Sequence, residues 1–241
     1  MNRDYSDSTS ARAGEQEATS TIVSRLDNIL ATLPEGVNLV AVSKFHPVEA
    51  LREAYDAGQR HFGESRVQEL TVKVPALPAD ILWHFIGHLQ TNKVRQLLRQ
   101  RPALIESVDT ERLLGIIDQE AERQGIVARV LLQLHVAREE TKFGFSPDEM
   151  LDYFAGRRFE SLKATHICGI MGMASNTDDT ARVSADFETI ASTFRRITEL
   201  CPDLRGFDTL SMGMSHDYPL AIAAGSNSVR IGTAIFGERV Y

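Results

Sequence analysis

The sequence predicts the α/β class, as one closed (β/α)8 barrel, from three observations. A chain of 241 residues with 43% hydrophobic residues can bury a large core, and barrels of about this length commonly form one domain. Short apolar runs alternate with helical patterns along the chain. One of these runs, residues 37–44, lies between turn signals and has the composition of a strand buried on both faces, which is typical of a parallel sheet.

The start of the chain divides into a tail and a helix. Residues 1–19 are polar and lack bulky apolar groups, which predicts a disordered tail before a barrel domain of residues 20–241. Apolar residues then recur at helical spacing behind the possible caps Ser20 and Thr21, and they are Ile22, Leu26, Ile29, Leu30 and Leu33. We expect this extra helix to close the bottom of the barrel.

Eight strand candidates follow one another with helical patterns between them. The strands are expected at residues 37–44, 60–62, 82–86, 104–108, 128–136, 166–171, 207–210 and 228–231. Helical patterns lie at residues 47–57, 94–98, 113–121 and 183–200. Right-handed βαβ units in this number close naturally into a barrel. An open doubly wound sheet is the alternative, but no Gly-x-Gly-x-x-Gly motif follows any strand candidate.

Charge and composition exclude some classes of function. A net charge of -7 argues against a nucleic-acid partner, since such proteins usually carry a basic face. No run of about 18 apolar residues occurs, so we expect no membrane partner. Cys168 and Cys201 are isolated, which favours core thiols in a reducing, cytoplasmic compartment.

Lys44 ends the first apolar run, at the carboxyl end of a predicted barrel strand. This end is the active-site face of such barrels. In a partly dry pocket a lysine loses hydration, its pKa falls, and its amine becomes a nucleophile that can form a Schiff base. The alternative is a solvated surface lysine, which is the common state of this residue at a strand end.

Two loops rich in small and polar residues follow the seventh and eighth strands. Loops at these positions form the usual phosphate site of the barrel, and the candidates are Ser211, Gly213, Ser215, Gly232 and Thr233. Alternatively, these residues cap the following helices. Arg230 lies beside this site, either in a structural charge pair or as a donor to a ring nitrogen or substrate oxygen.

His84 and His88 are the candidate pair of metal ligands, and two features argue against a metal site there. Strand and loop geometry would not hold them on one helix face, and no nearby carboxylate offers a third ligand. We therefore expect no metal and interpret both as pocket or core residues. The polar segments 63–66 and 90–93 either line the mouth of the barrel or cap helices.

Several ordered motifs carry a family resemblance that spans residues 22–241. They are Ala41-Val42-Ser43-Lys44, His61-Phe62-Gly63-Glu64, Val67-Gln68-Glu69, residues 84–93, Ser211-Met212-Gly213-Met214-Ser215 with Asp217, and Val229-Arg230-Ile231-Gly232-Thr233. Together they resemble the pyridoxal phosphate homeostasis proteins. The resemblance implies a barrel like the N-terminal domain of alanine racemase, with pyridoxal 5'-phosphate as cofactor.

The resemblance also assigns roles to residues. Lys44 matches the Schiff-base position, and Arg230 matches the residue that faces the pyridine nitrogen. Phosphate-binding positions are matched by Ser211, Gly232 and Thr233, with backbone help from Met212 and Gly213. Ser65 departs from the family, which usually has Asn there, so no ring contact is carried over to it. Residues 139–145 also diverge, and we expect them to form a mobile loop after the fifth strand.

Two features favour carrying the cofactor over catalysis with it. Arginine does not readily give up its proton, so the ring nitrogen opposite Arg230 stays unprotonated and the cofactor is a poor electron sink. The chain also ends at Tyr241, without the C-terminal β-domain that gives racemases a tyrosine base and a dimer interface. We therefore expect a monomeric carrier that serves vitamin B6 homeostasis and delivers the cofactor to apoenzymes.

Two other functions stay open on the sequence. A small amino-acid racemase or other pyridoxal enzyme would use Lys44 as its general base. A barrel enzyme that binds phosphate without a cofactor would use Lys44 as an ordinary active-site cation.

Overall fold

The computed structural model describes residues 21–136 and 143–238, which form a closed barrel of eight parallel strands. The strands are β1 (Asn38–Val42), β2 (His61–Glu64), β3 (Leu82–Phe85), β4 (Leu104–Val108), β5 (Ala128–His135), β6 (Thr165–Met173), β7 (Thr209–Ser211) and β8 (Ser228–Ile231). Neighbours in the sequence pair in order, and β8 closes on β1 through pairs such as Val40 with Arg230. The predicted barrel is confirmed, and the open sheet is excluded.

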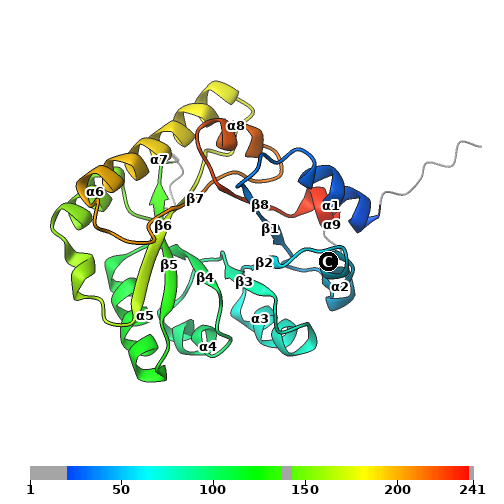
Figure 1. Cartoon of the computed structure of the whole chain (residues 1–241), viewed down its shortest axis with the longest axis horizontal. Helices are drawn as coiled ribbons and strands as arrows, with labels where there is room; N and C mark the ends of the chain where they lie inside the picture. The colour runs from blue at the N-terminus through cyan, green and yellow to red at the C-terminus, as the bar shows by residue number, and fades with distance from the viewer. Residues whose placement is uncertain (1–20, 137–142, 239–241) are drawn as a thin grey trace, which may run out of the picture.

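The helices form a ring around the strands, as Figure 1 shows. They are α1 (Ile22–Leu30), α2 (Val48–Asp56), α3 (Val67–Lys73), α4 (Val94–Leu98), α5 (Glu111–Gln124), α6 (Pro147–Ala155), α7 (Thr180–Leu200), α8 (Tyr218–Ala223) and α9 (Thr233–Phe236), with short 3-10 turns at Val74–Ala76, Thr91–Lys93 and Arg158–Ser161. Within the described ranges, no helix is long and apolar enough to cross a membrane.

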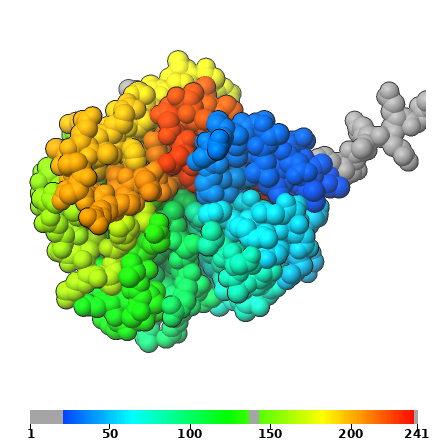
Figure 2. All heavy atoms as spheres, in the orientation of Figure 1, coloured from blue at the N-terminus to red at the C-terminus, as the bar shows by residue number. Residues whose placement is uncertain are grey.

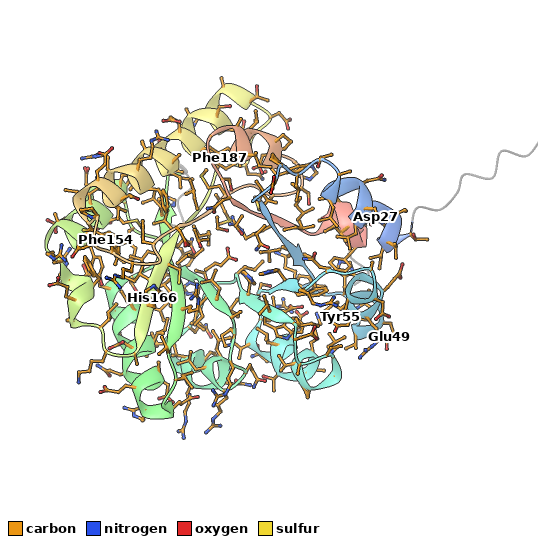
Figure 3. The ribbon with its side chains drawn as sticks, in the orientation of Figure 1. Asp27, Glu49, Tyr55, Phe154, His166 and Phe187 are labelled. Carbon is orange, nitrogen blue, oxygen red and sulfur yellow. The ribbon has the colours of Figure 1, made fainter. Side chains whose placement is uncertain are left out.

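The main core lies between the sheet and this ring. Phe154 of α6 and Phe187 of α7 are fully buried there, and Figure 3 shows both between their helices and the strands. A second, smaller apolar cluster lies inside the barrel and consists of Leu104, Leu131, Cys168 and Met171. The alternation of side chains along each strand separates these two layers.

The helix at the start of the chain does not close the bottom of the barrel, so that prediction is wrong. Helix α1 packs against α2 and α9 in the outer ring, where Arg25 Nε donates to the carbonyl of Ile235 at 2.7 Å. Figure 2 shows this first segment in blue beside the orange-red C-terminal segments. The amino ends of the strands instead line an open cavity of about 650 Å³, and its described lining includes no residue of α1. The helix lies in the outer ring because its apolar face is buried there against the neighbouring helices.

Some predictions fall outside the described residues. The tail of residues 1–19 is one of them, and most of the expected loop at residues 139–145 is another. Of that loop the structure describes Phe143 to Phe145, where Gly144 has a φ of 120°. Phe145 pairs with β5, since its amide donates to the carbonyl of Gln133 at 2.8 Å.

Candidate functional site

A cavity of about 290 Å³ opens at the carboxyl ends of the strands. Strand ends and the loops after β1, β7 and β8 supply its lining, which consists of Val42, Lys44, His46, Ile86, Met171, Met173, Met214, Ser215, His216, Arg230, Gly232 and Thr233. The lining combines three methionines and other apolar side chains with basic and hydroxyl groups. This is the face on which barrels of this kind place their active sites.

Lys44 lies two residues beyond the end of β1, half-buried, and lines the cavity. The next residue, Phe45, has a φ of 68°, a left-handed conformation that a bulky side chain rarely adopts. Arg66 holds the Phe45 ring by placing its guanidinium carbon 4.6 Å from the ring centroid. Strain of this kind is typical of functional sites, and here it turns the chain away while the lysine stays at the cavity.

A buried ion-pair network fixes the backbone on both sides of this lysine. Lys73 Nζ donates to the carbonyl of Ser43 at 2.9 Å, to Glu64 Oε1 at 2.6 Å and to Glu69 Oε2 at 3.0 Å. The same Glu69 oxygen accepts the amide of Phe45 at 2.8 Å. Burial raises the pKa of Glu69, but the Phe45 amide and the Lys73 ammonium outweigh it and lower the pKa.

The polar side of the cavity is rich in hydrogen-bond donors. The amide of Gly232 donates to Ser215 Oγ at 3.4 Å, which brings the loops after β7 and β8 together. Thr233 and Ala234 stand in the first turn of α9, where backbone amides have no helical acceptor. A Cβ at position 232 would lie 3.1 Å from the carbonyl oxygen of Val42, which is tighter than an ordinary contact, so glycine suits this close approach. The arrangement suits an anion.

Ser211, Met212 and Gly213 lie behind the lining of the cavity. The Ser211 hydroxyl is fully buried and donates to Glu106 Oε2 at 2.6 Å. The Met212 amide donates to the carbonyl of Ser228 at 3.1 Å, and the carbonyl of Gly213 accepts the amide of Arg230 at 3.0 Å. These three residues hold β7 and β8 in position, and a direct phosphate contact at them stays a prediction.

Arg230 is 4% exposed and contributes to the cavity from β8. Its guanidinium donates to the Ser211 hydroxyl and, at 3.0 Å, to the carbonyl of Gly172. Glu106 Oε2 lies 3.6 Å from the same guanidinium. Burial lowers the pKa of Arg230, while the charge of Glu106 acts in the opposite direction. The arginine is thus held in one orientation by a charge pair and also lines the cavity, while its role as a donor to a ring nitrogen or substrate oxygen stays a prediction.

The histidines and Ser65 have other surroundings. His84 lies in the barrel interior against Glu106, and the half-exposed His88 pairs with Asp109 at 2.9 Å. Over residues 21–136 and 143–238, no group of three His, Cys, Asp or Glu residues could hold a metal. Ser65 lines a separate small pocket of about 190 Å³ that also contains His88.

Sequence reasoning missed Glu106 and Lys73, which orient Arg230 and the Lys44 turn. Glu106 is fully buried in the middle of β4. A charged residue inside a strand buried on both faces costs free energy unless it is paired, and this was the available signal. Lys73 gave no such signal, because a lysine in the last turn of a helix is usually exposed.

Comparison with known proteins agrees with this architecture. Residues 19–240 match the family described as alanine racemase, N-terminal domain. A pyridoxal phosphate homeostasis protein of Schizosaccharomyces pombe is 39% identical over 228 residues, covering 91% of this chain and 94% of the relative. One of Helicobacter pylori is 38% identical over 203 residues, covering 84% and 88%.

Solved structures give the same result. PipY of Synechococcus elongatus, with PLP bound, is 37% identical with a TM-score of 0.81, and the match covers 90% of this chain and 100% of PipY. Alanine racemase of E. faecalis, at 22% identity and a TM-score of 0.68, shares the fold over 90% of this chain and 57% of its own. The chain belongs to the pyridoxal phosphate homeostasis proteins, a family that has the fold of the alanine racemase N-terminal domain.

Proposed function

We propose that this protein binds pyridoxal 5'-phosphate through a Schiff base at Lys44 and serves vitamin B6 homeostasis as a carrier. One observation carries the proposal: Lys44, Arg230 and the donor-rich loops at Ser215 and Gly232 line the same cavity. A relative with 37% identity, PipY, has PLP bound in its solved structure. Pyridoxal phosphate supplies an aldehyde that condenses with an amine and a ring that withdraws electrons from the product.

The residues present fit this group at three points. The half-buried Lys44 amine, which lines the cavity, is the nucleophile. Arg230 donates toward the ring nitrogen from the cavity wall. Ser215, Gly232 and Thr233 supply hydroxyl and amide donors for the phosphate, and the missing side chain of Gly232 lets this loop lie close to Val42 of the barrel wall. Ser211, Met212 and Gly213 support this end from behind, with backbone contacts to the phosphate as a further expectation.

Carrying is favoured over catalysis by the chemistry of Arg230. Its guanidinium keeps its proton, so it donates a hydrogen bond to the ring nitrogen without protonating it. An unprotonated ring accepts electrons poorly, and this discourages proton abstraction from a bound amino acid. Lys44 therefore holds the cofactor, and we propose that apoenzymes in the cytoplasm are the recipients.

The test is the visible spectrum of the purified protein with added pyridoxal phosphate, before and after borohydride. We expect a yellow band that borohydride abolishes and a pyridoxyl adduct on the peptide that contains Lys44. The variant Lys44→Ala should lose both. Lys163→Ala is the matched control, because Lys163 is exposed, lies just before the amino end of β6 and pairs with Glu122 of α5. An adduct on other lysines alone, or none at all, would contradict the proposal and favour a phosphate-binding enzyme.

A second measurement separates carrier from enzyme. Loaded protein is incubated with single L-amino acids, and the appearance of D-isomers is followed by chiral chromatography. The carrier proposal predicts at most the slow conversion that free pyridoxal phosphate also gives. Sustained turnover that disappears in Lys44→Ala would instead establish the racemase alternative.

A further inference from the structure

The barrel interior contains polar side chains from five strands. They lie beside the apolar cluster of Leu104, Leu131, Cys168 and Met171. Barrels of this kind usually fill their interior with bulky branched side chains. Burying polar groups there costs free energy unless each one finds a partner, so the contacts among them need an explanation.

Five side chains form a continuous hydrogen-bonded chain, which we call the interior chain. His61 Nδ1 lies 3.0 Å from His84 Nε2, and His84 Nδ1 lies 2.6 Å from Glu106 Oε1. Glu106 Oε2 accepts from Ser211 Oγ at 2.6 Å, and Ser211 in turn accepts from Arg230. The residues come from β2, β3, β4, β7 and β8, so the barrel itself assembles the chain.

The two ends of the interior chain lie in different cavities. Arg230 lines the cavity at the carboxyl ends of the strands, together with Lys44. His61 lines the cavity of about 650 Å³ at the amino ends, together with His84. The interior chain thus connects the proposed cofactor site with the opposite opening of the barrel.

The donors and acceptors of the interior chain fix its direction. An ionised carboxylate only accepts, so Glu106 takes its hydrogen bonds from His84 Nδ1–H and from the Ser211 hydroxyl. A neutral His84 then accepts at Nε2, and the donor is His61 Nδ1–H. This leaves His61 Nε2 as an acceptor on the side of the amino-end cavity.

We propose that the interior chain is a path for a proton that enters at His61. Transfer of this proton changes the strength of the ion pair between Glu106 and Arg230. A hydronium ion in the amino-end cavity gives its proton to His61 Nε2 and leaves as water, and the Nδ1–H bond of His61 breaks as that proton forms a new bond to His84 Nε2. His61 ends neutral, and His84 becomes an imidazolium beside Glu106. Charge and atoms balance, because one proton enters and one positive charge appears on His84.

The expected consequence appears at Arg230. With His84 neutral, the negative charge of Glu106 faces Arg230 alone at 3.6 Å. With His84 charged, two cations share one carboxylate, and Arg230 becomes a stronger donor toward the ring nitrogen. Glu106, His84 and His61 are therefore positioning residues that act through Arg230. This step rests on the proposed function, whereas the proton exchange itself does not.

The titratable groups near His61 determine whether His61 carries a proton at neutral pH. His84 from β3 and Glu106 from β4 are the titratable neighbours that act on the pKa of His61, whereas Arg129 from β5, Asp208 just before β7 and the uncharged Asn38 of β1 only line the same cavity. Burial and then the neighbouring His84 lower the pKa of His61 to about 4. His61 is therefore neutral at pH 7 and accepts a proton only in acid.

The first test needs no cofactor and no variant. Protein labelled with 15N in its histidines is studied by NMR from pH 8 to pH 4. We expect His84 to carry its proton on Nδ1 at pH 8, and acidification to protonate His84 Nε2. A His84 that is protonated on Nε2 alone at pH 8 would overturn the proposal, because the direction of the chain would be reversed.

The second part of this test replaces His61, the residue at which the proton would enter. In His61→Gln the acid titration of His84 should shift by ~0.5 pH unit or more, since the proton has lost its route and its partner. Asp208→Asn is the matched control, because Asp208 lines the same cavity and has no place in the interior chain. An identical His84 titration in His61→Gln and the unchanged protein would also overturn the proposal.

The third part uses the loaded protein. The midpoint of the acid-dependent change in the visible spectrum should move in His61→Gln and in Glu106→Gln, and stay in place in Asp208→Asn. If the cofactor binds and the midpoint is the same in the unchanged protein and in all three variants, the inference fails and the proposed function stands. If no cofactor binds at all, the proposed function fails, and the NMR titration still decides the proton path.

Discussion

At the scale of single residues, Gly232 shows how close packing limits which residue a position accepts. Its φ of -118° is open to any residue, so the restriction is not strain. An added Cβ would meet the carbonyl oxygen of Val42 at 3.1 Å and its Cβ at 3.2 Å, both of them parts of the barrel wall. These contacts are tighter than ordinary van der Waals contact, so a methyl group here would push the loop after β8 away from the wall and move its donors.

Gly232→Ala should therefore weaken binding of pyridoxal phosphate by about tenfold, or about 1.4 kcal/mol, and leave the fold intact. Fluorescence titration measures the affinity. Gly115→Ala is the matched control, because a Cβ there meets nothing within 4 Å in the interior of α5. That change should stabilise the protein by about 0.5–1 kcal/mol without affecting affinity. Equal affinities in both variants would refute the placement of the phosphate.

His61 gives the stability of the protein a pH dependence. Its pKa is lowered to about 4 from the ordinary value of 6.5. The unfolded chain binds a proton below about pH 6.5 and the folded protein does not until about pH 4, so the free energy of unfolding falls as pH drops through this window.

In His61→Gln this contribution is absent. The loss of stability between pH 7 and pH 4.5 should be smaller than in the unchanged protein by about 1 kcal/mol, after allowance for solvent screening of the half-buried ring. Urea unfolding at the two pH values measures the difference. Parallel losses in both proteins would show that the ring is not shielded from protons in the folded state.

At the scale of elements, helix α3 carries the ion pair that shapes the turn after β1. Lys73 is 5% exposed and bonds to the carbonyl of Ser43 and to Glu64 and Glu69. Removal of one partner from such a buried network leaves the others with uncompensated charge. The helix is thereby tied to the backbone on both sides of Lys44.

Lys73→Met should destabilise the protein by about 3–5 kcal/mol and lower the yield of the Lys44 adduct in the borohydride experiment. Lys163→Met removes an exposed pair with Glu122 and should cost less than about 1 kcal/mol. Denaturant unfolding compares the two. Similar stabilities for both variants would mean that the network around Lys73 is open to water.

At the scale of the whole molecule, the described surface favours a monomer. Large apolar side chains that are exposed include Leu30 on α1, Val72 on α3, Val127 before β5 and Leu200 at the end of α7. These four lie on separate elements, whereas the exposed Met173 and Met214 share the lining of the cavity at the carboxyl ends of the strands.

We predict a monomer of 26.8 kDa in solution, measured by light scattering over a concentration series with and without pyridoxal phosphate. The mass should stay constant in both series. A dimer that persists at the lowest concentration would show that the family barrel has an interface elsewhere on its surface.

The fold was predictable because its strands are local apolar runs. The candidates at residues 104–108 and 228–231 match β4 and β8, and the others differ from the observed strands by a few residues at their ends. Several short helices were missed, although Ser146 and Glu149 form a capping box around Pro147 at the start of α6. Helices of four to nine residues show too few turns for their period to be recognised.

The sequence by itself determined the barrel, the place of Lys44 at its carboxyl end, and the small residues that line the cavity at Gly232 and Thr233. Each of these follows from residue type and local order along the chain. Tertiary structure alone decided that Glu106 and Ser211, 105 residues apart, share a hydrogen bond inside the barrel. It likewise placed Ser211 to Gly213 behind the cavity, because closure of the barrel sets which inward side chains meet, and no local pattern records that register.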